Sequence, residues 1–160
     1  MVENLFNQLP VFEGLTDEQC EQLKPLFVPC DFQAETMLFG QGEPAEHLYL
    51  VVLGEVVVAF KPDDGPPITV ARVQPGGIVG WSAALGSRVY TSGAQCAVDT
   101  QLLRVRGADL RKLCEEQPET GMVLLDRLAT VIAQRLSSTH DQVVALLQLG
   151  LRNGVSSIGG

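Results

Sequence analysis

The amino-acid sequence predicts a mainly β domain of the sandwich or jelly-roll type, with helices at both ends. Three observations support this class. Residues 28–106 contain short β-rich runs between regularly spaced turn residues, the segments on either side carry helical patterns, and the chain holds 16 glycines and 9 prolines. Short, frequently interrupted strands are typical of these folds. The 160 residues fit one domain, and 46% hydrophobic residues suffice to bury a core.

The N-terminal segment, residues 1–27, predicts helix in two pieces. Thr16 is a good N-cap residue, and Gln19 stands three positions later, which is the spacing of a capping box. Leu15 and Cys20 occupy the positions of a hydrophobic staple around that cap. We therefore expect a helix to begin directly after Thr16.

The central segment predicts seven short strands separated by turns. The β-rich runs are residues 28–32, 36–39, 47–53, 55–61, 67–74, 94–98 and 102–106. Glycines and prolines between them mark the turns, and residues 63–65 (DDG) are expected at a hairpin tip because glycine adopts a positive φ there. The strands together define a β unit over about residues 28–106.

The C-terminal segment predicts two helices, residues 107–117 and a long one from Pro118 to about Gln148. Apolar residues recur along the long helix at steps of mostly three or four, as in a narrow seam. Two interpretations are open: the helix packs on its own β unit, or it forms a homodimer seam. We favour the seam, with contacts from Leu128, Ile132, Leu136 and Val143. The domain is expected to cover residues 1–149, and residues 150–160 to form a flexible tail.

Charge and hydropathy limit the partners of this chain. Its formal net charge is −8 and it has no Lys/Arg-rich run, so we expect no direct binding to nucleic acid or to an anionic membrane surface. The N-terminus lacks the basic and apolar regions of a signal peptide, and no run reaches the roughly 18 apolar residues of a membrane span. A cytoplasmic location is the expectation.

No pattern in the sequence predicts catalysis, a metal site or a cofactor. The four cysteines, Cys20, Cys30, Cys96 and Cys114, fit no zinc or iron–sulfur spacing. A metal-dependent β-barrel enzyme needs several histidines with a carboxylate, and this chain has only two histidines, far apart in the sequence. Nucleophile-elbow and zinc-protease motifs are absent from the sequence. We expect no enzymatic activity, no metal and no cofactor.

Several short motifs, in their order and spacing, resemble one known family. They are residues 9–16 (LPVFEGLT), 39–42 (FGQG), Tyr49, 54–57 (GEVV) and 75–80 (PGGIVG). Over about residues 5–149 the chain is similar to the cyclic-nucleotide-binding domain of the catabolite activator protein and its relatives. The resemblance implies a double-stranded β-helix, or jelly-roll-like β-roll, with N-terminal helices and a long C-terminal dimer helix.

The resemblance also implies a phosphate-binding cassette after Gly80. In the family a glutamate follows that glycine and accepts a hydrogen bond from the ribose hydroxyl. An arginine about ten residues later pairs with the cyclic phosphate. Here Trp81 and Tyr90 stand at these two places. The segment resembles a recurring bacterial variant of the cassette, whose ligand is a cyclic nucleotide, another anion or none.

The other candidate ligand contacts come from the same resemblance. The amide groups of Ser82 and Ala83 would point at an anion from a helix N-terminus. Thr91 and Ser92 stand at the family's small hydroxyl residues. Arg88, two residues before Tyr90, is a candidate cation by its proximity alone and not by the resemblance. On the long helix, Thr139 takes the position that contacts the base.

Each of the two aromatic residues has two interpretations. Trp81 either fills an emptied ribose pocket, which we favour, or provides a platform on which a ring stacks. Tyr90 is either a packed core phenol or a neutral donor to a ligand.

Without the carboxylate and the cation, we expect cyclic AMP and cyclic GMP to bind weakly. The sequence thus predicts a ligand-sensing regulatory domain of the cyclic-nucleotide-binding type. The alternative is a dimerisation or interaction scaffold that binds no nucleotide.

Overall fold

The computed structural model describes residues 9–62, 65–81 and 88–136. Its N-terminal part contains two short 3-10 helices, η1 (Pro10–Phe12) and η2 (Lys24–Leu26), on either side of helix α2 (Asp17–Leu23). The capping box is confirmed. The Thr16 hydroxyl accepts from the Gln19 amide at 3.1 Å, and the Gln19 side chain accepts from the Thr16 amide at 3.0 Å. This reciprocal pair satisfies two amides that the first helical turn leaves free.

Within the described residues, eight strands make two four-stranded antiparallel sheets. The strands are β1 (Val28–Phe32), β2 (Met37–Phe39), β3 (His47–Leu53), β4 (Val56–Phe60), β5 (Ile68–Val73), β6 (Ile78–Val79), β7 (Gly93–Cys96) and β8 (Thr100–Arg106). Seven of them correspond to the predicted runs, with ends shifted by a few residues at most. The exception is β6, which has only two residues and follows a turn so closely that no period-2 pattern marks it.

The pairing of the strands is nested. One sheet has the order β1-β8-β3-β6 and the other the order β2-β7-β4-β5, so β1 pairs with β8, β2 with β7, β3 with β6 and β4 with β5. This is the pairing of one long hairpin that is rolled up on itself, as in a jelly roll. The predicted β-roll is confirmed.

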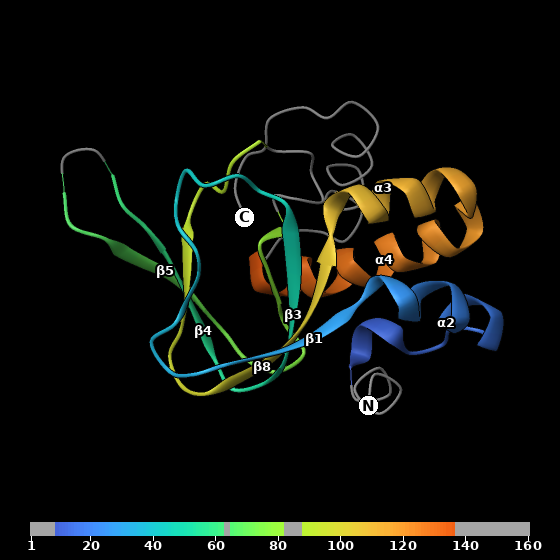
Figure 1. The fold of residues 1–160 in the computed structure, drawn as a ribbon, viewed down its shortest axis with the longest axis horizontal. Coiled ribbons are helices and arrows are strands. Elements are labelled where there is room, and N and C mark those ends of the chain that lie inside the picture. Colours follow the sequence, from blue (N-terminus) through green and yellow to red (C-terminus); the bar gives the residue numbers. More distant parts are fainter. Residues whose placement is uncertain (1–8, 63–64, 82–87, 137–160) are drawn as a thin grey trace.

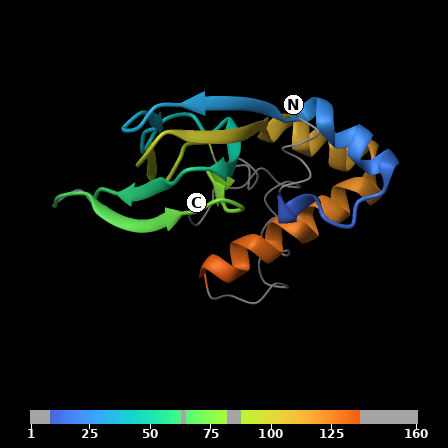
Figure 2. The ribbon, with the colours of Figure 1, turned by 90° about the horizontal axis from the view of Figure 1, so that it is seen from below.

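Two C-terminal helices follow the roll, α3 (Gly107–Glu116) and α4 (Pro118–Leu136). The part of the predicted long helix beyond Leu136 lies outside the described residues, as does the expected tail. Figures 1 and 2 show α2, α3 and α4 gathered on one side of the roll, while the β4–β5 hairpin projects on the other. No helix in the described ranges is long and apolar enough to span a membrane.

The buried side chains form two separate clusters, one on each face of the β3-containing sheet. Because side chains alternate along a strand, Leu48 and Leu50 of β3 point to the helices, whereas Tyr49 and Val51 point into the roll. Leu103 of β8 lies on the helix side in the same way. We call these clusters the helix-side core and the roll core. The candidate site lies around Gly80, where the chain passes from the roll core at Val79 to the helix-side core at Trp81.

Candidate functional site

The two ends of the expected phosphate-binding cassette lie close together at the start of strand β3. Strand β6 leads to Gly80 and Trp81, and the chain is described again from Arg88. Ser82 and Ala83, the predicted anion-binding amides, lie outside the described residues. The geometry of the site is therefore given by the residues that flank the cassette.

Gly80 occupies a position that favours glycine. Its φ is +76°, in the left-handed region that side chains rarely adopt. A Cβ atom there would lie 3.0 Å from the His47 carbonyl oxygen and 3.1 Å from the ring of Phe39. Both the backbone conformation and the close approach of β3 thus favour glycine over other residues.

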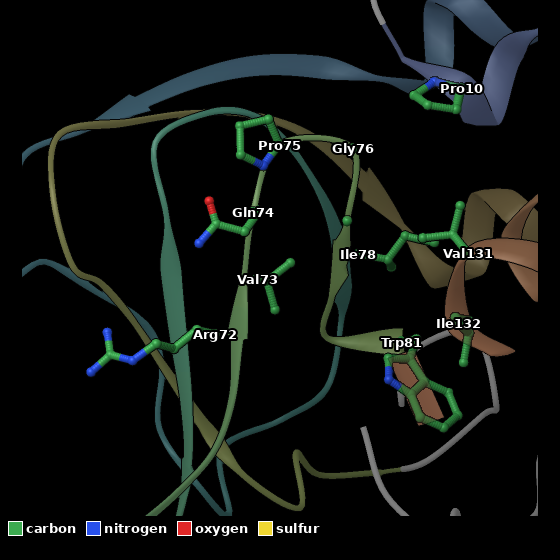
Figure 3. Close-up of a pocket in the computed structure, with 11 residues that line it drawn as sticks. Pro10, Arg72, Val73, Gln74, Pro75, Gly76, Ile78, Trp81, Val131 and Ile132 are labelled. Atoms are coloured by element: carbon green, nitrogen blue, oxygen red, sulfur yellow. The ribbon is translucent and has the colours of Figure 1, made fainter. Parts of the chain in front are cut away.

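Trp81 turns away from the roll. Val79 belongs to the roll core, and period-2 alternation would send the side chain two residues later to the same face. Instead Trp81 is only 4% exposed and packs in the helix-side core with Ile132 of α4. The left-handed turn at Gly80 lies between the two residues. Figure 3 shows the indole beside Ile132.

Tyr90, by contrast, fills the roll core. It is 4% exposed, and its ring stacks on Phe39 with centroids 3.6 Å apart and an angle of 14° between the planes. Its hydroxyl donates to the His47 carbonyl at 2.6 Å and accepts from the His47 amide at 3.0 Å. The phenol is thus held by the main chain of β3 and by an aromatic neighbour, in the packing that the core-phenol interpretation describes.

The backbone around Tyr90 is tied to the segment before β3. The Gly42 amide donates to the Tyr90 carbonyl at 2.8 Å, the Tyr90 amide donates to Glu43 at 2.9 Å, and the Ala45 amide donates to the Arg88 carbonyl at 3.0 Å. These bonds fix residues 88–90, at the C-terminal end of the cassette, against residues 42–45. The Arg88 side chain is exposed.

One polar atom beside Tyr90 has no partner. The Thr91 hydroxyl oxygen is buried and forms no hydrogen bond in the described structure. Buried hydroxyls are usually satisfied, so an unpaired one next to a ligand cassette marks a candidate contact. Ser92, the next predicted residue, is half-buried.

The predicted seam residues of α4 lie in two different situations. Leu128 and Ile132 are 1% and 3% exposed within the single chain and belong to its helix-side core. Their burial is what the alternative interpretation, a helix packed on its own domain, requires. The side chain of Leu136 and all of Thr139 and Val143 lie outside the described residues, so the dimer stays a prediction.

Two residues of this site were not predicted as site residues from the sequence, Phe39 and His47. Phe39 was recognised only as part of a family motif, and His47 acts through its main chain, for which side-chain chemistry leaves no signal. In the described ranges, no group of three or more His, Cys, Asp or Glu residues is arranged to hold a metal ion.

The buried phenol makes stability depend on pH in the alkaline range. Burial, the main cause, raises the pKa of Tyr90 to about 12, compared with about 10 for an unfolded tyrosine. Because the folded pKa is the higher one, the stabilising effect is complete below pH 10 and is lost as the pH rises towards 12. We expect the free energy of unfolding to fall over this window.

Chemical unfolding at pH 8 to 11.5, compared between the unaltered chain and Tyr90→Phe, measures this effect. Tyr49, Cys96 and Cys114, whose burial also raises their pKa values, are present in both proteins. The difference between the two proteins therefore isolates Tyr90. An identical pH slope in both would contradict the assignment.

A family model and a similar protein of known function both relate this chain to cyclic-nucleotide-binding proteins. The model of the cyclic nucleotide-binding domain matches residues 29–117. The CRP-like cAMP-activated global transcriptional regulator of Mycobacterium tuberculosis (strain CDC 1551 / Oshkosh) is 22% identical over 146 residues, which cover 91% of this chain and 63% of that protein. The chain thus spans less than two thirds of the length of this regulator.

Solved structures share the fold. The Thermus thermophilus catabolite activator protein superposes with a TM-score of 0.66 at 27% identity, over 87% of this chain and 63% of that one. The N-terminal domain of a transcriptional regulator from Streptomyces coelicolor A3(2) gives a TM-score of 0.65 at 25% identity, over 86% of this chain and 94% of that one. With a nested β-roll, flanking helices and a family match over more than half of its 160 residues, the chain belongs to the cyclic nucleotide-binding domain family.

Proposed function

We propose that this chain is a ligand-sensing regulatory domain that binds cyclic AMP and cyclic GMP at best in the high-micromolar to millimolar range. The observation that carries the proposal is the packing of Tyr90. This residue stands where the family resemblance places the phosphate-binding arginine, yet its hydroxyl is bonded to the main chain of His47 and its ring is stacked on Phe39. A neutral, internally bonded phenol supplies no cation to a phosphate.

The position of the ribose acceptor supports the same proposal. Trp81 stands there and packs towards α4, in the helix-side core. Loss of a buried charged partner typically costs a ligand about 2–5 kcal/mol, which is roughly 30- to 4000-fold in affinity. Loss of the ribose acceptor adds about 1–3 kcal/mol. A site of micromolar affinity would thereby weaken to the millimolar range.

Residual anion binding is compatible with the described groups. The unpaired Thr91 hydroxyl is a donor that depends on neither aromatic residue. The amides of Ser82 and Ala83 are further candidates from the resemblance. A sulfate, a phosphate or a weakly held nucleotide is therefore the expected occupant of the cassette.

Isothermal calorimetry with cyclic AMP and cyclic GMP tests the proposal. We expect no measurable heat of binding at low-micromolar ligand for the unaltered chain. Binding in the low-micromolar range would overturn the proposal and would point to another cation, with the exposed Arg88 as the first to replace by alanine.

The double variant Trp81→Glu, Tyr90→Arg tests the two positions directly. Restoring the carboxylate and the cation should strengthen cyclic-nucleotide binding by at least about 30-fold, if both groups reach the ligand as in the family. The control is Trp81→Phe, Tyr90→Phe, which changes the same positions without adding charge and should leave the affinity unchanged. Circular dichroism checks that both variants fold, because both positions are buried.

A second candidate function is a scaffold that acts without a nucleotide. The observation that favours it is that both aromatic side chains are buried, one in each core, and neither brings a charged group to the cassette. In that case a thermal-shift screen of cyclic and linear nucleotides gives no stabilisation. A ligand of the sensing domain, present at 100 times its Kd, would stabilise it by about 2.7 kcal/mol.

A further inference from the structure

An open cavity of about 390 Å³ lies between the roll and the helices. Three segments distant in the sequence line it: Pro10 of η1, the turn between β5 and β6, and Val131 and Ile132 of α4. Figure 3 shows these segments around the space, with Trp81 on one side. Small-molecule sites are usually clefts of about 300–1,000 Å³ with mainly apolar walls, and this open cavity falls in that range.

The walls of the cavity are mainly apolar. The apolar and proline side chains that line it with Pro10 are Val73, Pro75, Ile78, Trp81, Val131 and Ile132. Four of these are less than 5% exposed and form part of the cores, so the wall is rigidly supported. Val131 is half-buried and packs at the edge of the helix-side core. A volume of about 390 Å³ is enough for two fused rings, with part of the ligand left open to solvent.

The polar groups at the rim already have partners in the protein. Arg72 forms an ion pair with Glu55 at 3.0 Å, and the Gln74 side chain donates to the same carboxylate. Figure 3 shows the Arg72 side chain directed away from Trp81 and α4.

The main chain of the turn is also bonded. The Gly76 amide donates to Val51 at 2.8 Å, and the Gly77 carbonyl accepts from the Val51 amide at 2.9 Å. A phosphate or carboxylate would have to compete with Glu55 for Arg72 and Gln74, whereas an uncharged ring displaces no hydrogen bond.

We propose that this cavity is a binding site for a small, uncharged, flat apolar molecule of about two rings, separate from the nucleotide cassette. Trp81 gives the site its link to the cassette, because it forms one wall and stands directly before that segment. Ile132 gives the link to α4. A bound ring would lie against both side chains and so join the start of the cassette to the long helix.

A pair of fluorescent probes tests the chemical class of the ligand. 2-Dimethylaminonaphthalene is uncharged, flat and fluorescent, and 6-dimethylaminonaphthalene-2-sulfonate has the same two rings with an added sulfonate. We expect the uncharged probe to bind with one-to-one stoichiometry and to accept excitation energy from Trp81, the only tryptophan of the chain. The sulfonate should bind at least about tenfold more weakly. Equal or tighter binding of the sulfonate would overturn the proposal.

Filling the cavity tests its location. Val131→Phe places a ring into the space and should weaken the uncharged probe by at least about tenfold. Val123→Phe is the matched control, since Val123 is half-buried on the same helix and does not line the cavity. Equal binding by both variants and the unaltered chain would contradict the assignment.

A second measurement uses the unaltered protein and so does not depend on the folding of a variant. Nuclear Overhauser effects from the naphthyl protons should reach the methyl groups of Ile78 and Ile132. Contacts only to exposed methyl groups, such as those of Leu53 and Ile68, would show surface adsorption and overturn the proposal. Neither experiment involves a cyclic nucleotide, so its outcome is independent of the affinity of the cassette.

Discussion

Replacement of Tyr90 by alanine should lower the free energy of unfolding by about 3–5 kcal/mol, the usual range for loss of a buried aromatic side chain. The ring of Tyr90 stacks on Phe39 in the roll core. Its removal leaves a cavity there and also leaves the amide and carbonyl of His47 without the partner they have now. The effect combines lost packing with two lost hydrogen bonds.

Urea unfolding followed by circular dichroism measures this change, and Tyr90→Phe separates its two causes. The phenylalanine keeps the ring and loses only the hydroxyl, so a loss of about 1–3 kcal/mol is expected from the unsatisfied main-chain groups. Val89→Ala, at an exposed neighbour, should change the stability by no more than about 0.5 kcal/mol. If alanine at position 90 left the stability within about 1 kcal/mol of the original, Tyr90 would not be a core residue.

Replacement of Ile132 by glutamate should destabilise the folded chain by about 4 kcal/mol or more. Ile132 is 3% exposed and packs in the helix-side core with Trp81. The substitution removes apolar contacts and places a carboxylate where it has no partner and little water. We expect loss of cooperative thermal unfolding or a large drop in Tm.

Two further measurements are needed to interpret the stability of the Ile132→Glu variant. Thr130→Glu, at an exposed position of the same helix, is the control and should change the stability by no more than about 0.5 kcal/mol. Light scattering gives the mass of the unaltered chain and so tests the predicted dimer without a substitution. A stable Ile132→Glu variant with half the mass of the original would contradict the burial of Ile132 within one chain. It would support the predicted contact of Ile132 in a dimer seam.

A large part of the fold follows from local patterns in the sequence. The capping box at Thr16 depends on side chains three residues apart, and strand β3 depends on a run of six apolar, aromatic and β-branched residues after His47. Such signals are independent of the rest of the chain, because near neighbours form the interactions that they encode. The short strand β6 has no such pattern, since its two residues are held by pairing with Tyr49 and Leu50.

The direction of each site side chain was decided by the tertiary structure. The sequence alone identified Trp81 and Tyr90 as departures from a family pattern, and it allowed two interpretations for each. The structure separates them into different cores, Trp81 against α4 and Tyr90 against Phe39, because a left-handed turn at Gly80 lies between Val79 and Trp81. That reversal is a property of the backbone conformation, which alternation along a strand does not predict.

Helix α4 is a second example in which the sequence predicted a pattern and the tertiary structure decided its role. Spacing of three and four residues determines that the helix has one apolar face, and the sequence established this much. It does not determine what covers that face, because either a second chain or the helix's own domain can supply an apolar surface. At Leu128 and Ile132 the cover is the chain's own helix-side core, since the rolled sheet brings β3, β8 and η1 to the same side as α4. That arrangement includes contacts of α4 with η1, which lies more than 100 residues earlier in the sequence and which only folding brings to it.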